Sequence, residues 1–155
     1  MAIPVVVKGL TFLIPETSER RWGDETTNYL VTLGTAVNDI TSVGDIPLLS
    51  IPINNNQTTL INVDNLSFET TQVRHAIIEY SVYRVTSSEE VSQCGNLLIT
   101  YKNNAATWEL IDNTVGDAGV SFTITTAGQV QYTSTNMAGT GYQSKMSFRA
   151  RAFPI

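Results

Sequence analysis

Apolar and polar residues alternate along the C-terminal end of the chain. Between Lys145 and Ala152 every second residue is apolar, and these residues are Met146, Phe148, Ala150 and Ala152. The residues between them are polar or charged, namely Lys145, Ser147, Arg149 and Arg151. Because successive side chains of a strand point to opposite faces, this pattern predicts a strand with one buried face and one face toward solvent.

The same alternation occurs twice more. From Gly119 to Ser134 it predicts a hairpin that turns at Ala127-Gly128, since glycine suits such turns. Its inward positions are expected to be Val120, Phe122, Ile124, Val130 and Tyr132. In a longer segment, one face should carry Ala76, Ile78, Tyr80 and Val82.

Taken together, the alternating segments predict a mainly β protein. Clusters of Asn, Gly and Asp, which favour turns, separate them. Only 15% of the residues are charged, which is also typical of a β protein with many turns. We expect an antiparallel β-sandwich of the jelly-roll type. Its strands are predicted at Leu48–Ile53, Thr58–Val63, Leu66–Thr70, His75–Val85, Leu97–Tyr101, Thr107–Ile111, Val120–Thr125, Gln129–Thr133 and Ser144–Phe153.

The N-terminal segment is apolar at nearly every position. We interpret Ile3 to Ile14, closed by Pro15, as an extended arm or strand whose two faces are both apolar. Such a strand is usually covered on both sides. It is either a central strand of the sandwich or a segment that lies against a neighbouring subunit, as exposed apolar patches often do.

A single short helix is predicted from about Asp24 to Asp39. Asp24 is a suitable N-cap, and apolar residues recur at spacings of three and four. A lone helix of this length is marginal in water, so it should dock on another surface. With the passage from Gly44 to Pro52 taken as a boundary, we predict an attachment region at residues 1–45 and a β-sandwich domain at 46–155.

Charge and apolar content argue against several kinds of partner. The net charge of -5 disfavours nucleic acid, since phosphate binding needs clustered Lys and Arg. The basic group Lys145, Arg149 and Arg151 is expected on a solvated outer strand face, with an inter-subunit salt bridge as the alternative. No run of about 18 apolar residues predicts a membrane span, and the N-terminus lacks a secretory pattern, so synthesis in the cytoplasm is expected. The single cysteine, Cys94, is predicted to be a small buried side chain.

The sequence offers little catalytic chemistry. His75 is the one histidine, and a structural or solvent-facing role is expected for it. A third hypothesis is a glycoside-acting enzyme that uses Glu109 with Asp112 or Asp117, but any protein with many acidic residues offers such pairs. Asp112 and Asp117 are interpreted as turn-forming and not as cation ligands. No phosphate-binding, zinc or dinucleotide motif occurs, so we predict a protein that is not an enzyme and that takes no cofactor or metal.

Several short segments of the chain resemble a known protein family. These are Ser92 to Thr100, Asp117 to Phe122, Gln129 to Thr135 and Lys145 to Ala150, which are similar to a β-sandwich module of bacteriophage and prophage virion proteins. Phe12 to Arg20 and Trp22 to Thr27 are similar to a segment that accompanies that module. The resemblance implies a part of the virion, because such modules occur in head decoration proteins, head fibres and tail fibres, often as trimers. It implies no catalytic residues.

The leading hypothesis is therefore a virion structural protein of the capsid decoration, cement or head-fibre type. It would act by binding other virion proteins, such as the major capsid protein or fibre and tail subunits, and would form a homo-oligomer, expected to be a trimer. The alternative is a receptor-binding tail-fibre tip whose turns at Asn103, Asn104 and Thr135 to Tyr142 contact host glycan. The predicted interface residues are Val5, Val7, Leu10, Phe12, Ile14, Trp22, Leu30, Leu33 and Val37.

Overall fold

The structure is a computed structural model that describes residues 2–7, 10–15, 30–31, 34 and 43–155. Its contacts divide the chain into two compact units, residues 1–42 and 43–155. The boundary predicted after residue 45 lies close to this division. The attachment role predicted for the first unit stays a prediction.

The first unit contains two paired strands where one extended arm was predicted. Strand β1 (Ala2–Val7) pairs antiparallel with β2 (Leu10–Pro15). The apolar run is interrupted in the sequence by Lys8 and Gly9, and a chain that reverses within such a run can pair its own backbone groups. The single-arm interpretation was therefore wrong.

Most of the predicted helix from Asp24 to Asp39 lies outside the described residues. The backbone is helical at Leu30, Val31 and Gly34, which are the described positions within it.

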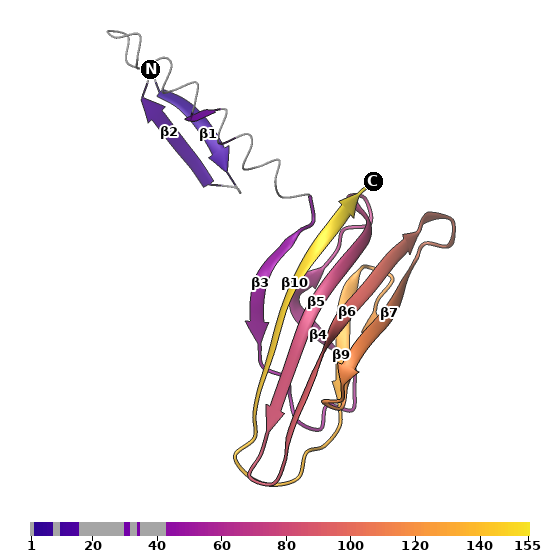
Figure 1. Cartoon of the computed structure of the whole chain (residues 1–155). Coiled ribbons are helices and arrows are strands. Elements are labelled where there is room, and N and C mark those ends of the chain that lie inside the picture. The colour runs from indigo at the N-terminus through magenta and orange to yellow at the C-terminus, as the bar shows by residue number, and fades with distance from the viewer. Residues whose placement is uncertain (1, 8–9, 16–29, 32–33, 35–42) are drawn as a thin grey trace. The chain divides into compact units, whose positions relative to one another are not determined.

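The second unit is a sandwich of two antiparallel sheets, which confirms the predicted fold class (Figure 1). The large sheet has the order β3-β10-β5-β6-β7, and the small sheet has the order β4-β9-β8. The large sheet comprises β3 (Ile46–Ile51), β10 (Gln143–Pro154), β5 (Val73–Val85), β6 (Glu90–Lys102) and β7 (Thr107–Gly116). The small sheet comprises β4 (Ile61–Ser67), β9 (Gln129–Ser134) and β8 (Val120–Ile124). A short 3₁₀ turn, η1 (Asn103–Ala105), joins β6 to β7.

The strand order combines two patterns. At the start and end of the sandwich the chain crosses between the sheets, from β3 to β4 and from β9 to β10, as in a jelly roll. In the middle, β5, β6 and β7 follow one another as neighbours in the large sheet, as in a meander.

The core lies between the two sheets, and the alternation places its residues as predicted. The inward row of β10 is buried at Met146, Phe148, Ala150 and Ala152, and that of β5 is buried at Ala76, Ile78, Tyr80 and Val82. The small sheet contributes buried Val63, Leu66, Val120, Val130 and Tyr132. Aromatic rings fill one region, where the Trp108 ring centroid lies 5.1 Å from that of Tyr101 and 6.3 Å from that of Phe68.

The predicted hairpin at Ala127-Gly128 joins β8 to β9. Gly128 has a φ of +85°, and its N–H donates to the Thr125 carbonyl at 3.0 Å. A Cβ at this glycine would lie 2.1 Å from the Phe68 carbonyl oxygen. Glycine is therefore required here both by the left-handed backbone and by the close approach of the neighbouring chain.

One strand, β4, replaces the two strands predicted at 58–63 and 66–70. Val63 and Leu66 are both fully buried although they are three residues apart, which breaks the period of two. The pairing with β9 shifts register between Asn62 and Ser67, and Asn65 adopts a φ of +61°. The irregularity returns Leu66 to the core, so the strand continues where the sequence suggested a break.

Strands β6 and β7 are longer than predicted. Their pairing extends to Gln93 opposite Gly116, so the turn expected from Asn113 onward begins only after β7 ends. Polar residues are accepted there because β7 is an edge strand and its end is largely exposed. The prediction that Cys94 is buried was wrong. In β6 the inward position is taken by Gln93, which is buried, and the next residue, Cys94, faces outward and is exposed.

Candidate functional site

Four loops converge at one end of the sandwich, here called the Arg84 end. They comprise residues 54–60, 86–89, 117–119 and 135–142, which follow β3, β5, β7 and β9. The Asn56 N–H donates to the Thr135 carbonyl at 3.2 Å, and the Thr135 N–H donates to the Gly119 carbonyl at 2.9 Å. The Ser87 N–H donates to the Thr140 carbonyl at 2.9 Å. Backbone hydrogen bonds thus join the loops directly to one another.

A buried arginine lies beneath these loops. The side chain of Arg84 is fully buried, at 0% exposure, because it occupies the next inward position of β5 after Val82. Its guanidinium group donates to four acceptors. These are the Ala118 carbonyl at 2.5 Å, the Thr135 carbonyl at 2.7 Å, Asn55 Oδ1 at 3.0 Å and the Tyr142 hydroxyl at 3.0 Å.

The acceptors of Arg84 are all neutral, and they come from three different loops. A buried cation is costly unless its hydrogen-bonding capacity is met, and here carbonyl, amide and hydroxyl oxygens meet it in place of a carboxylate. Arg84 also stacks against Tyr142, with its guanidinium carbon 5.5 Å from the ring centroid. One side chain therefore holds three of the loops in a fixed relation to β5.

Side-chain bonds complete the framework. Asn55 accepts from the Met137 N–H at 2.8 Å and donates to the Met137 carbonyl at 3.0 Å. Thr86 Oγ1 donates to the Ala138 carbonyl at 2.6 Å, and Ser87 Oγ accepts from the Thr140 N–H at 3.0 Å. The loop from 135 to 142 is thus tied at several points although most of it is exposed.

Two adjoining hollows open beside the Arg84 end. They have volumes of about 490 Å³ and about 430 Å³ and share Asp117, Val120 and Ser121. The remaining lining of the larger one is Asn56, Gln57, Thr58, Gly119, Thr133, Ser134 and Thr135. The remaining lining of the smaller one is Gln93, Asp112, Thr114, Gly116 and Phe122. The hydroxyl, amide and carboxylate groups in these linings suit a polar ligand without negative charge, since no Lys or Arg is among them.

Two hydrogen bonds connect the lining of the smaller hollow to a buried tyrosine. The buried Tyr80 hydroxyl donates to Asp112 Oδ1 at 2.8 Å and accepts from Gln93 Nε2 at 2.9 Å. Burial, above all, raises the pKa of the Tyr80 phenol above its ordinary value of 10.0, and the Asp112 carboxylate adds to the rise. Asp112 is thereby held in a fixed position at the hollow.

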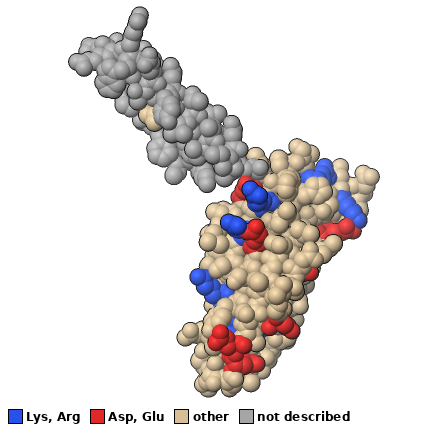
Figure 2. Space-filling view, viewed as in Figure 1, with Lys and Arg blue, Asp and Glu red and all other residues tan. Residues whose placement is uncertain are grey.

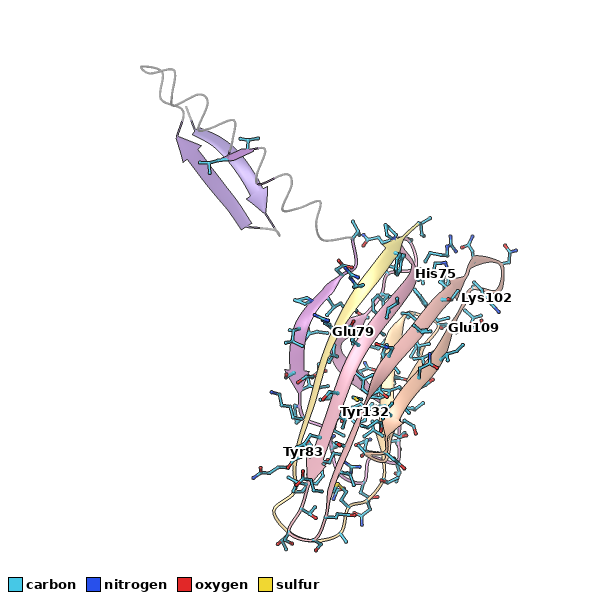
Figure 3. All side chains as sticks on the ribbon, viewed as in Figure 1. His75, Glu79, Tyr83, Lys102, Glu109 and Tyr132 are labelled. Carbon is cyan, nitrogen blue, oxygen red and sulfur yellow. The ribbon has the colours of Figure 1, made fainter. Side chains whose placement is uncertain are left out.

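The structure separates the two turns predicted to contact a receptor together. Val85 pairs with Gln143 and Glu90, which places residues 135–142 at the end of β5. His75 pairs with Thr100, which places Asn103 and Asn104 beyond the start of β5. Figure 3 shows the same direction, with His75 and Tyr83 toward opposite ends of the strand. The 13 residues of β5 span about 40 Å, so one ligand cannot readily bridge both turns.

The candidate catalytic residues are also apart. Glu109 and Asp112 are three residues apart in β7, which places them on opposite faces of the sheet. Glu109 forms an ion pair with Lys102 beside the β6–β7 turn (Figure 3). Asp117 Oδ1 accepts from the Gly119 N–H at 2.7 Å, which is the turn-forming role predicted for it.

The lone histidine lies on the outer face of the large sheet. His75 is exposed, and its Nδ1 lies 3.1 Å from Thr100 Oγ1 on the paired strand. This agrees with the solvent-facing position predicted from the sequence.

The predicted basic group lies on the same outer face. Lys145, Arg149 and Arg151 are all exposed, as expected, and Arg149 forms an ion pair with Glu79 on the neighbouring strand. The face seen in Figure 2 is otherwise sparsely charged, with small groups of either sign scattered over the described residues.

Only part of the predicted interface can be placed. The hairpin register sets Val5 opposite Phe12 and Val7 opposite Leu10, with Ile14 opposite Ile3. Leu30 is helical and 40% exposed. The remaining predicted positions, Trp22, Leu33 and Val37, lie outside the described residues.

The sequence interpretation missed Arg84, although a signal for it was present. The alternation that identified Ala76 to Val82 as inward continues by two residues to Arg84. An arginine at an inward strand position requires several buried acceptors, and these come from loops that the sequence alone does not bring together.

Comparisons with known proteins add one structural likeness. No protein-family model matches the sequence, and no curated protein matches it. The chain is similar to part of the tailspike protein of Acinetobacter phage vB_ApiP_P1, with a TM-score of 0.43 and 10% sequence identity. The likeness covers 68% of this chain and 22% of the tailspike chain, so the chain spans about a fifth of that protein's length.

The described residues offer neither a metal-binding cluster nor a membrane-spanning helix. No group of three or more His, Cys, Asp or Glu side chains in this part of the chain is arranged to hold a metal ion. Among the same residues, no helix has the length and apolar content needed to cross a membrane.

Proposed function

We propose that this chain is a structural subunit of a phage particle that acts by binding and not by catalysis. Residues 1–42 would attach it to another virion protein, and the sandwich would face outward. The finer assignment is a decoration, cement or head-fibre-type subunit that works as a homo-oligomer. It would be made in the host cytoplasm and incorporated into the virion.

The observation that carries this proposal is the division of the chain into an apolar hairpin unit and a sandwich with its own core. Among the described residues, the buried core cluster of the sandwich draws only on positions from Ile53 to Ala152. The hairpin in the first unit is built almost wholly from apolar residues, which form opposed pairs such as Val5 with Phe12. A domain with its own core and a separate apolar segment suits a subunit that is held by that segment in an assembly.

Truncation tests the attachment role. Particles of the phage or induced prophage that encodes the chain should contain the full chain after density-gradient purification. A chain reduced to residues 43–155 should remain folded by circular dichroism yet be missing from those particles. The paired substitution Val5→Asp with Phe12→Asp should act like the truncation, whereas Thr11→Asp should not. Equal incorporation of the truncated chain would show that residues 1–42 are not the attachment unit.

A second candidate function is receptor binding, which is favoured by the rigid Arg84 end. Its loops are fixed by buried hydrogen bonds, and pre-ordered loops lose less entropy when a ligand binds. The adjoining hollows offer amide, hydroxyl and carboxylate groups, which can exchange hydrogen bonds with the hydroxyl groups of a neutral host glycan.

Blocking the hollows separates the two candidates. Ser121 is exposed and lines both of them, so Ser121→Trp should fill the space without disturbing the core. Under the receptor hypothesis, this variant loses binding to host cells and to their purified surface polysaccharide, while Thr126→Trp at the β8–β9 turn does not. If Ser121→Trp binds cells as well as the native chain and is still incorporated into particles, the receptor hypothesis is wrong and only the attachment function remains.

A further inference from the structure

The two edges of the large sheet differ in how well they are protected. Edge strand β3 has six residues and carries Pro47, which cannot donate a backbone hydrogen bond. Edge strand β7 has ten residues, contains neither Pro nor Lys, and pairs only with β6 within the part of the chain that the structure describes. Its two acidic residues have partners within the chain, since Glu109 pairs with Lys102 and Asp112 accepts from Tyr80. A long edge without proline or lysine is a template for pairing with another strand.

An apolar row crosses the outer face of the large sheet and stops at this open edge. The register sets Ile77 opposite Leu98 and Leu98 opposite Ile111. Exposure rises along the row, from half-buried Ile77 through 37% at Leu98 to 61% at Ile111. Within this row, the most exposed side chain, Ile111, is therefore the one on the strand with the unpaired backbone edge.

We propose that a second copy of this chain pairs with β7 in antiparallel fashion, around a two-fold axis at Ile111. This register sets Ile111 opposite Ile111 of the second copy and pairs every residue from Thr107 to Val115. The apolar row then continues without a break through Ile111, Leu98 and Ile77 of the second copy. A two-fold axis presents the same residues from the second copy in reverse order. A row that ends at the edge of one copy is therefore continued by the row of the other copy.

The charges on β7 disfavour an axis placed further toward the C-terminal end of the strand, and an axis at Leu110 would break the apolar row by setting Ile111 opposite Glu109. With the axis at Ile111, Glu109 lies opposite the Asn113 amide of the second copy, which can donate to the carboxylate. An axis at Asp112 would set the Asp112 carboxylates of the two copies directly opposite each other. An axis at Asn113 would set Glu109 opposite Asp117, and like charges directly opposite one another are destabilising.

The inference concerns the sandwich and does not depend on where in a particle the chain lies. Its first test is the mass of the full chain in solution by light scattering. The expected mass is an even multiple of the single chain that falls by half on Ile111→Lys. The matched control is Leu48→Lys on β3, where a leucine that is 70% exposed, against 61% for Ile111, lies on the other edge of the same sheet. A single-chain mass at all concentrations, or an oligomer that Ile111→Lys leaves intact, overturns the proposal.

Cross-linking tests the register in a Cys94→Ser background. Under mild oxidation, Ile111→Cys should form a disulfide-linked dimer by itself, because the axis brings the two side chains together. Asn113→Cys should not do so alone, but it should cross-link when mixed with Glu109→Cys. Cross-linking of Asn113→Cys alone, with none at Ile111→Cys, would place the axis elsewhere and overturn the proposed pairing.

Discussion

Replacing Arg84 by methionine keeps an unbranched apolar stem and removes the guanidinium group that ties the loops to β5. The largest local loss is at the Ala118 carbonyl, whose hydrogen bond at 2.5 Å comes from Arg84. An unsatisfied buried carbonyl costs about 1–3 kcal/mol, and each hydrogen bond to a charged group contributes about 1.5–3 kcal/mol. The variant also no longer buries a cation without a carboxylate, which offsets part of the loss.

The other acceptors of Arg84 keep partners of their own. The Thr135 carbonyl still accepts from the Asn56 N–H, and Asn55 still accepts from the Met137 N–H. The Tyr142 hydroxyl still donates to a carbonyl of the β3–β4 loop. We therefore expect a net loss of about 3 kcal/mol, which lies within the usual cost of removing one member of a buried polar network.

Urea unfolding checks this magnitude, with Arg74→Met as the control. Arg74 is half-buried, donates to the Tyr101 carbonyl at 3.5 Å and lies over the Tyr101 ring, so its loss should cost less than about 1 kcal/mol. Hydrogen exchange should accelerate in residues 135–142 of Arg84→Met and stay unchanged in Arg74→Met. Equal unfolding midpoints for the two variants would show that Arg84 does not organise the loops.

Three further predictions concern single side chains. Gly128→Ala should destabilise the sandwich by more than about 2 kcal/mol because its Cβ meets the Phe68 carbonyl, whereas Gly141→Ala, with φ +68° and open space around it, should cost about 1 kcal/mol in thermal unfolding. The raised pKa of Tyr80 contributes stability that is fully present below its ordinary value of 10.0 and is lost as pH rises through the raised value, so urea midpoints should fall at alkaline pH more steeply in the native chain than in Tyr80→Phe. Cys94 should react with a thiol reagent such as Ellman's reagent without denaturant, and protection in a monomeric sample would contradict its outward position.

Much of the sandwich could be predicted because its strands lie half in the core and half in water. In β5 and β10 the period of two, read from the sequence, correctly identified the buried apolar rows at 76–82 and 146–152. The same rule failed at β4, where a bulge brings Val63 and Leu66 to the same side, and at the polar parts of β6 and β7. At these places hydrogen bonds to a neighbouring strand maintain the strand. Pairing depends on two segments, so the sequence of one segment does not predict it.

The candidate site was less predictable because it is formed by loops distant in sequence. Residues 135–142 were recognised as a turn that could meet a ligand, but Asn103 and Asn104 were assigned to the same surface and lie at the other end. Which loops share an end depends on the direction and register of each strand.

The sequence by itself determined the β class, the inward rows of the longest strands, the β8–β9 turn and the sparse charge, since each of these follows from local side-chain chemistry. Tertiary structure alone decided that the apolar N-terminal run pairs with itself, that Cys94 faces outward, and that Arg84 gathers its acceptors from separate loops. Local pattern states which side of a strand is apolar. Only the packing of one sheet on another, and the requirement that every buried polar group finds a partner, decides which distant residues meet.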